Sequence, residues 1–217
     1  MKMRKQNRAS LAFLIVLLTA AAGLAAFVGY SLYPSTRETR FAAAAVSETG
    51  EGVIIEFSLR SRPGNGALLV NIANASWRED AEHSFRAARE QAECLLGVPL
   101  NNRDYELSLA SAQEGVAGES AGAAFASAII ANYLNAQLRG DAVISAALNN
   151  ANKSSDELQP IGGADEKILA AANAGKKVFL IAQSQQLKYE GELARRIQIK
   201  RLRSLREAVA LLIRRRS

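Results

Sequence analysis

The chain has 217 residues, 49% hydrophobic and 22% charged, which is enough apolar surface to form a core and excludes a wholly disordered protein. Its single cysteine, Cys94, and single histidine, His83, exclude an intrachain disulfide, a cysteine zinc site and a multi-histidine metal site. The net charge of +6 comes from residues 1–8 and 195–217, while residues 9–194 are net acidic, so we expect no nucleic-acid-binding face.

The N-terminal segment has the features of a membrane anchor. Residues 11–33 are uncharged and largely apolar, and a helix of about 20 such residues spans a bilayer. Basic residues within 1–10 precede this run, so the positive-inside rule predicts a cytoplasmic N-terminus and an extracytoplasmic remainder of the chain. A cleaved signal peptide, with small residues 20–22 at the cleavage site, and a buried core helix are the alternatives.

An alanine-rich linker over residues 34–45 is expected to lead into a folded domain over residues 46–217. At the start of this domain, residues 53–59 and 67–72 read as strands. The turn residues Pro-Gly-Asn-Gly at 63–66 separate them, so the two strands are predicted to form a hairpin.

The middle of the chain mixes helices and short strands. Residues 77–96 have helical periodicity and end at Gly-Val-Pro, and residues 105–110 alternate as a short strand. A helix of small residues is then expected to extend to about Leu138, followed by a strand over residues 142–148. Residues 149–158 read as a polar loop.

The last third of the chain alternates helices and strands. Asp165 is expected to be the N-cap of a helix that ends at Gly175. Residues 177–182 read as a buried strand, 197–202 as an edge strand, and 204–213 as a final helix capped by its first residue, a serine. Because strands first pair locally and then alternate with helices, the predicted fold class is α+β (mixed α/β).

Two segments concentrate residues with chemical potential. Residues 118–122 read Gly-Glu-Ser-Ala-Gly at a helix start, where Ser120 lies beside amides that can hold an oxyanion. Residues 160–167 read Pro-Ile-Gly-Gly-Ala-Asp-Glu-Lys, and burial of Lys167 in the apolar helix that follows would lower its pKa toward that of a general base. Each segment also has a structural explanation: a capped, close-packed helix for the first and a solvent-facing lysine for the second.

Taken together and in this order, the two segments resemble the proteolytic domain of Lon proteases. In that family the nucleophile lies in Gly-Pro-Ser-Ala-Gly, and a lysine follows Pro-Ile-Gly-Gly by four residues. The resemblance covers roughly residues 46–213 and implies a Lon-like α+β domain in which Ser120 is the nucleophile and Lys167 takes its proton. It also implies oxyanion donors among the amides at the start of the Ser120 helix. Ser145 stands where the family commonly has a threonine that orients the lysine.

The chain departs from the family pattern at three points. Glu119 replaces the usual proline, although membrane-bound archaeal relatives also have an acidic residue there. Ala146 and Ala147 stand where many relatives have Gly-Glu on the substrate side. No Gly-x-x-x-x-Gly-Lys-Ser/Thr phosphate loop occurs in the sequence, so we expect the chain not to unfold substrates with ATP by itself.

The leading hypothesis is an ATP-independent serine endopeptidase that hydrolyses unfolded proteins or peptides through a Ser120–Lys167 dyad, without a cofactor or metal. It is expected to be held at the membrane by a single-pass N-terminal helix, with its catalytic domain outside the cytoplasm. The resemblance also implies a homo-oligomer. An anchored Lon-like binding or assembly module with a silent dyad, and a small-molecule kinase of the GHMP type, are the alternatives.

Three remaining features receive simpler interpretations. His83 lies in a polar helical stretch and is expected to be solvated rather than to serve as an alternative base. Cys94 is expected to be a small buried hydrophobic residue. The arginines at 214–216 are expected to be solvated, with contact to anionic lipid headgroups as the alternative.

Overall fold

The computed structural model describes residues 36–72, 75–109, 119–149 and 155–214. Residues Thr36–Ser217 form one compact unit. The expected anchor at residues 11–33 lies outside the described residues, and so does half of the expected polar loop, residues 150–154. Among the helices that are described, none is both long enough and apolar enough to cross a membrane.

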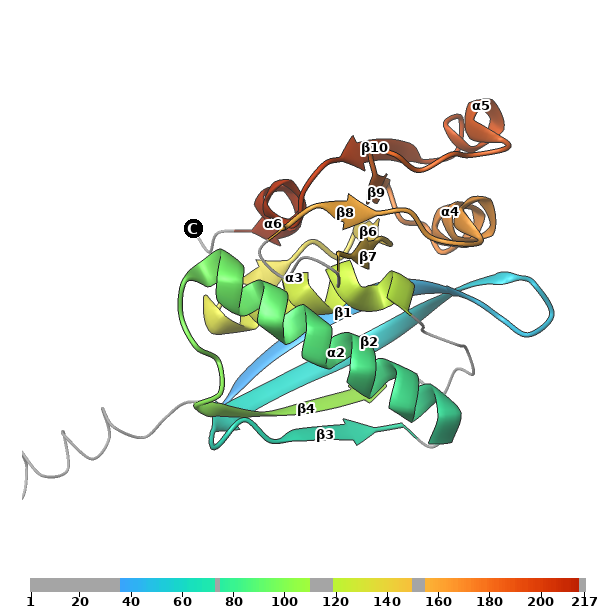
Figure 1. Cartoon of the computed structure of the whole chain (residues 1–217). Helices are drawn as coiled ribbons and strands as arrows, with labels where there is room; N and C mark the ends of the chain where they lie inside the picture. Colours follow the sequence, from blue (N-terminus) through green and yellow to red (C-terminus); the bar gives the residue numbers. More distant parts are fainter. Residues whose placement is uncertain (1–35, 73–74, 110–118, 150–154, 215–217) are drawn as a thin grey trace, which may run out of the picture. The chain divides into compact units, whose positions relative to one another are not determined.

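The first half of this unit is built on a four-stranded sheet with the order β1-β2-β4-β3 (Figure 1). Its strands are β1 (Arg37–Val46), β2 (Gly52–Pro63), β3 (Leu68–Asn71) and β4 (Arg103–Leu109). The first two form a long antiparallel hairpin, β4 pairs antiparallel with β2, and β3 pairs parallel with β4.

Two expectations about this sheet are wrong. Most of the segment expected as a linker over residues 34–45 is strand β1, which pairs with β2 along its whole length. Its alanines at 43–45 are buried, so small side chains there allow close packing rather than mark a flexible connection. The expected hairpin of residues 53–59 with 67–72 does not form either, because β4 lies between β2 and β3. A helix connects β3 to β4, and such a crossover is what a parallel strand pair requires.

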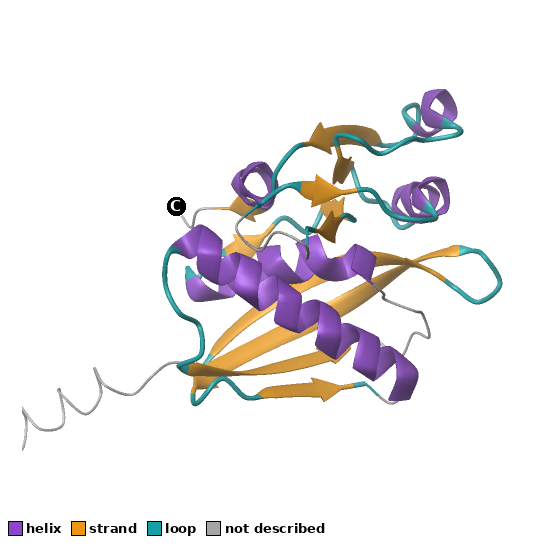
Figure 2. Cartoon of the chain, viewed as in Figure 1, coloured by secondary structure: helices purple, strands orange, loops and turns teal. Residues whose placement is uncertain are grey.

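Two helices, α2 (Ala75–Leu96) and α3 (Gly122–Tyr133), pack with this sheet (Figure 2). The helix expected at residues 77–96 is therefore confirmed. Phe125 of α3 packs edge-on against Phe57 of β2 at a centroid distance of 5.5 Å, so the apolar surface of α3 is covered by the sheet. The α3 helix is shorter than expected, because the chain reverses at Asn135 with a φ of 50° and then forms β5 (Gln137–Leu138).

The second half contains a parallel three-stranded sheet with the order β10-β9-β6. Its strands are β6 (Ala142–Ile144), β9 (Val178–Ala182) and β10 (Gln198–Leu202). The buried central strand and the edge strand were both expected from the sequence and are confirmed. Alternate side chains of β9 belong to two separate buried clusters, one that includes α3 and one that includes α4 (Ala164–Asn173).

The remaining elements are short. They are η1 (Glu119–Ala121), β7 (Ala147–Leu148), β8 (Leu158–Gln159), α5 (Glu190–Leu193), α6 (Leu205–Leu212) and β11 (Ile213–Arg214). The strand expected over residues 142–148 is interrupted at 145–146, and its second part pairs with β8 instead. Together these elements confirm the α+β fold class.

The ends of the later helices agree only in part with the expected caps. Gly163, with a φ of 62°, is the N-cap of α4, and Asp165 lies inside the first turn, so the expected cap is wrong. Gly175 follows the end of α4 with a φ of 73°, as expected of a C′ glycine. Ser204 caps α6, since its side chain accepts a hydrogen bond from the backbone N–H of Glu207.

We predict that Gly52→Ala destabilises the protein. A Cβ atom at Gly52 would lie 2.0 Å from the backbone oxygen of Glu166 in α4, and this backbone has no flexible end that can move aside. Overpacking of this kind lowers the free energy of unfolding by about 1–3 kcal/mol, which urea denaturation measures. Gly140→Ala is the matched control, because a Cβ added at Gly140 would have no heavy atom within 4 Å. Equal stability of the two variants would contradict the close contact between β2 and α4.

Candidate active site

Ser120 lies in the η1 turn that leads directly into α3, as the sequence suggested. The residue is partly exposed, and its backbone carbonyl accepts a hydrogen bond from the Ser145 hydroxyl at 3.3 Å. Its own hydroxyl makes no hydrogen bond with any residue in the described part of the chain. The Ser120 side chain is therefore accessible and not committed to a structural partner there.

Ser145 connects the Ser120 turn to the parallel sheet. It follows strand β6, is only 1% exposed, and donates its backbone N–H to the carbonyl of Leu180 in β9 at 3.1 Å. The same side chain holds the carbonyl of Ser120. The hydroxyl at position 145 thus positions the turn that carries Ser120, whereas the resemblance had implied a contact with the lysine.

The start of α3 is held at a second point. The backbone N–H of Ala123 donates to the carbonyl of Ala146 at 3.2 Å, so this amide is already used. Gly122 packs closely on Leu148, because a Cβ there would lie 3.1 Å from the leucine Cγ. The amide of Ala123 is therefore not free to serve as an oxyanion donor.

Lys167 lies in the first turns of α4 and is 5% exposed. Its backbone N–H donates to the carbonyl of Gly163 at 3.1 Å, but its ammonium group has no hydrogen bond or ion pair with the described residues. Burial lowers the pKa of this amine to about 8, and the nearby Glu166 opposes that change. The solvent-facing alternative for Lys167 is wrong, and its amine titrates in the range of a general base.

The helix that carries Lys167 packs closely against the β1–β2 hairpin. Gly52 of β2 lies against the backbone of Glu166, and Gly163 lies against Val46 of β1, where an added Cβ would come within 2.5 Å of Cγ2. Because Gly163 also has a positive φ, an alanine would be strained there by both the backbone and the space. Glycines at these two positions allow α4 to approach the hairpin closely enough to bury Lys167.

The segments of Ser120 and Lys167 are both attached to the sheet that contains β6, although no hydrogen bond joins their side chains in the described structure. Ser145, directly after β6, holds the Ser120 carbonyl. Ile168, next to Lys167, belongs to one buried cluster with Val143 of β6. The structure thus places both residues on elements packed around one short strand, β6.

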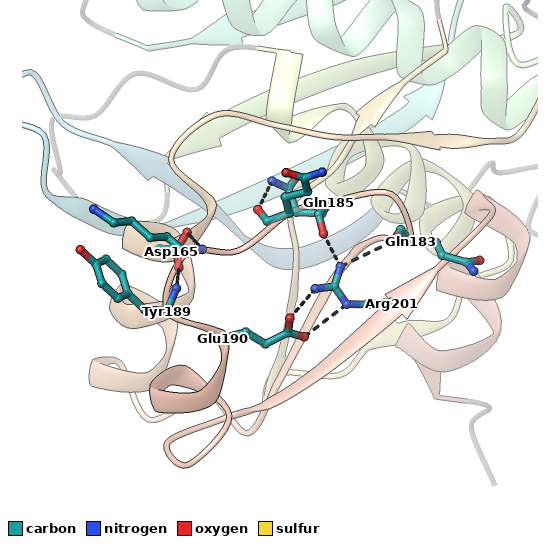
Figure 3. A network of polar contacts seen from close by, with 8 residues as sticks. Asp165, Gln183, Gln185, Tyr189, Glu190 and Arg201 are labelled. Atoms are coloured by element: carbon teal, nitrogen blue, oxygen red, sulfur yellow. Dashed lines mark hydrogen bonds and ion pairs between the residues drawn. The ribbon is translucent and has the colours of Figure 1, made fainter.

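A loop over residues 183–189 forms hydrogen bonds with the first turn of α4 and with the residues just before it (Figure 3). Gln185 is 8% exposed; its side-chain oxygen accepts from the Ile161 N–H at 2.8 Å, and its amide nitrogen donates to the Ile161 carbonyl at 3.2 Å. The carboxylate of Asp165 accepts from the backbone N–H groups of Lys188 and Tyr189 at 3.1 and 2.8 Å. Nothing in the sequence marks Gln185 as part of this region, because a lone glutamine in a loop has no recognisable spacing.

The other candidate residues are solvent-exposed. His83 is exposed on α2, as expected of a residue on a solvated helix face. Cys94 is also exposed, so its expected burial is wrong: it lies on the outer side of α2, whose buried face is formed by residues such as Ala88 and Ala92. Among the described residues, no three His, Cys, Asp or Glu side chains come together in a group suited to a metal ion.

No protein-family model matches the chain. The candidate site is therefore defined by the geometry around Ser120 and Lys167.

Lys167→Met is expected to remove a pH dependence of stability. The folded-state pKa of about 8 lies below the ordinary value of 10.5, so between these values the unfolded chain binds more protons and stability rises with pH. At pH 7 the methionine variant should be more stable by roughly 2–3 kcal/mol. Urea denaturation from pH 7 to 10 measures this, with the exposed lysine variant Lys177→Met as the control. An unchanged or reduced stability of Lys167→Met at pH 7 would contradict the burial of a charged amine.

Proposed function

We propose that the protein is a serine endopeptidase in which Ser120 is the nucleophile and Lys167 is the general base. The observation that carries the proposal is the burial of the Lys167 amine, which lowers its pKa to about 8 and leaves it without a partner among the described residues. A lysine in this state supplies a neutral amine near physiological pH, and such an amine can activate a serine hydroxyl. The accessible Ser120 at the start of α3 is the nucleophile that the motif pattern provides.

In the proposed reaction, neutral Lys167 takes the hydroxyl proton of Ser120 while the serine oxygen attacks the carbonyl carbon of a peptide bond. Backbone amides at the η1–α3 start stabilise the oxyanion that forms. The Lys167 ammonium then protonates the departing amine, which leaves an acyl-enzyme. A water molecule, deprotonated by Lys167, attacks the ester, and the proton returns to Ser120 as the acid product leaves.

No hydrogen bond joins the side chains of Ser120 and Lys167 in the described part of the chain, and the mechanism requires one only in the complex with substrate. Catalytic hydrogen bonds are often long without substrate and shorten in the complex. The attachment of both segments to the β6 region supports the proposal, because it holds the two residues on the same part of the fold.

The wider features of the proposal follow from the resemblance to Lon proteolytic domains. We propose a Lon-like domain that is ATP-independent, acts on unfolded proteins or peptides, and assembles into a homo-oligomer. Residues 11–33 anchor it in the membrane, with the domain on the extracytoplasmic side. The α+β fold, the Ser120 turn before a helix of small residues, and Lys167 four residues after Pro-Ile-Gly-Gly are the features that agree with this reading.

Hydrolysis of casein by the 217-residue chain, without ATP, tests the function. We expect cleavage by the wild type and a loss of at least roughly 1,000-fold in kcat/KM for both Ser120→Ala and Lys167→Met, because dyad members act as a unit. Ser184→Ala and Lys177→Met remove the same groups from exposed positions and should retain activity.

Each outcome of the casein assay has a clear meaning. Cleavage that survives in Ser120→Ala or Lys167→Met would overturn the dyad. A wild-type chain that neither cleaves casein nor forms an acyl-enzyme with an activated ester would overturn the peptidase and favour the binding or assembly module.

A further inference from the structure

We propose that Gln185 is a positioning residue for Lys167: its paired hydrogen bonds to Ile161 fix the turn from which α4 starts and thereby keep the lysine amine buried. The inference rests on the proposed function, in which that amine is the base. It concerns a residue that lies on a different element from either member of the dyad.

The N-terminus of α4 lacks a side-chain cap. Its N-cap is Gly163, which has no side chain to satisfy the free N–H groups of the first turn. Helix ends without such a partner fray readily. Lys167 lies only one turn from this end, so its burial depends on whether the first turn stays in place.

The side chain of Gln185 contacts Ile161 through both of its polar atoms. The side-chain amide forms hydrogen bonds with both the N–H and the C=O of Ile161, which fixes that residue in position and in orientation. Ile161 lies two residues before the Gly163 N-cap, whose carbonyl binds the backbone N–H of Lys167. Gln185 is therefore linked to Lys167 by its hydrogen bonds to Ile161, by the short backbone segment from Ile161 to Gly163, and by the hydrogen bond between Gly163 and Lys167.

The backbone of Gln185 is itself held by hydrogen bonds on both sides. Its backbone N–H donates to the carbonyl of Ala182 at the end of β9, at 3.0 Å, and its carbonyl accepts from Arg201 of β10. Arg201 is fixed in turn by two hydrogen bonds to the carboxylate of Glu190 (Figure 3). The buried Gln185 thus connects the parallel sheet to the start of α4. The carboxylate of Asp165 in α4 also binds the later part of the same loop, through the backbone N–H groups of Lys188 and Tyr189.

A change in the pKa of Lys167 would report a change in the burial of its amine, because most acidic groups on the elements packed against α4 are paired with other residues. Glu166, on the same helix, raises that pKa. The acidic groups of the packed elements are engaged elsewhere: Glu38 of β1 with Arg60, Glu56 of β2 with Lys176, and Glu190 of α5 with Arg201. The remaining acidic group on these elements, Glu192 of α5, is exposed.

The test is a direct titration of Lys167 by NMR in the 217-residue chain with isotope-labelled lysine, the signal being assigned by its loss in Lys167→Met. Gln185→Met keeps the side-chain length but removes the two hydrogen bonds to Ile161 and a third to the carbonyl of Gln186. In this variant we expect the pKa of Lys167 to rise by about one unit toward its ordinary value. The matched control is Gln186→Met, an exposed neighbour whose side chain makes no hydrogen bond with the described residues.

The same variants give a kinetic readout. If the pKa rises by one unit, kcat/KM at pH 8 should fall roughly fivefold, because less of the amine is neutral, and should recover near pH 10. A role in stability alone would lower the folded fraction without moving this pH profile. If Gln185→Met fails to fold, Gln185→Asn replaces it, since the shorter amide weakens the contact with Ile161 and should raise the pKa in the same direction by less.

The outcomes separate the inference from the proposed function. A Lys167 pKa near 8 in the wild type and an unchanged value in the Gln185 variant would overturn the positioning role and leave the dyad standing. A value near 10.5 in the wild type would overturn the base itself. A rise in Gln185→Met with no rise in Gln186→Met supports the inference whether or not a peptide substrate has been found.

Discussion

The burial of one amine, that of Lys167, is the constraint on which the account of this protein depends. An ammonium ion loses its hydration when it is buried, and the described residues offer Lys167 no hydrogen bond or ion pair in return. The neutral amine is therefore the favoured form at mildly alkaline pH. This arrangement is unfavourable for stability, and that is why it points to chemistry rather than to packing.

Several parts of the fold act together to maintain this burial. The β1–β2 hairpin packs against α4 at two glycines, Gly52 and Gly163, which leave room for close backbone contact. The 183–189 loop holds the turn before α4 through Gln185. Ser145, the residue directly after strand β6, donates a hydrogen bond from its hydroxyl to the carbonyl of Ser120. The two candidate catalytic residues are thus supported by backbone contacts from separate parts of the chain.

The sequence was most informative where a local pattern determines the structure. The helical periodicity of α2, the apolar run of β9 and the Ser204 cap of α6 were each read correctly, because each depends on residues close together in the chain. The position of Lys167 after Pro-Ile-Gly-Gly at the start of an apolar helix left both burial and a solvent-facing side chain open, and packing against the β1–β2 hairpin decides between them.

The sequence was least informative where distant residues decide the outcome. The alanines of β1 resemble a linker, and only their pairing with β2 makes them a strand. Nothing local to β3 shows that β4 will insert beside it after the α2 crossover. The contact between Gln185 and Ile161 joins residues 24 positions apart, and no spacing rule marks either of them. The features that support the candidate site were therefore the hardest to predict.

The most direct test of the dyad is covalent labelling of Ser120 by a fluorophosphonate probe over a range of pH, with the modified residue located by peptide mass spectrometry. The account predicts that Ser120 is modified, that the rate increases as pH rises through about 8, where the Lys167 amine loses its proton, and that Lys167→Met abolishes this increase. A wild-type chain whose Ser120 does not react, or reacts equally fast in Lys167→Met, would contradict it.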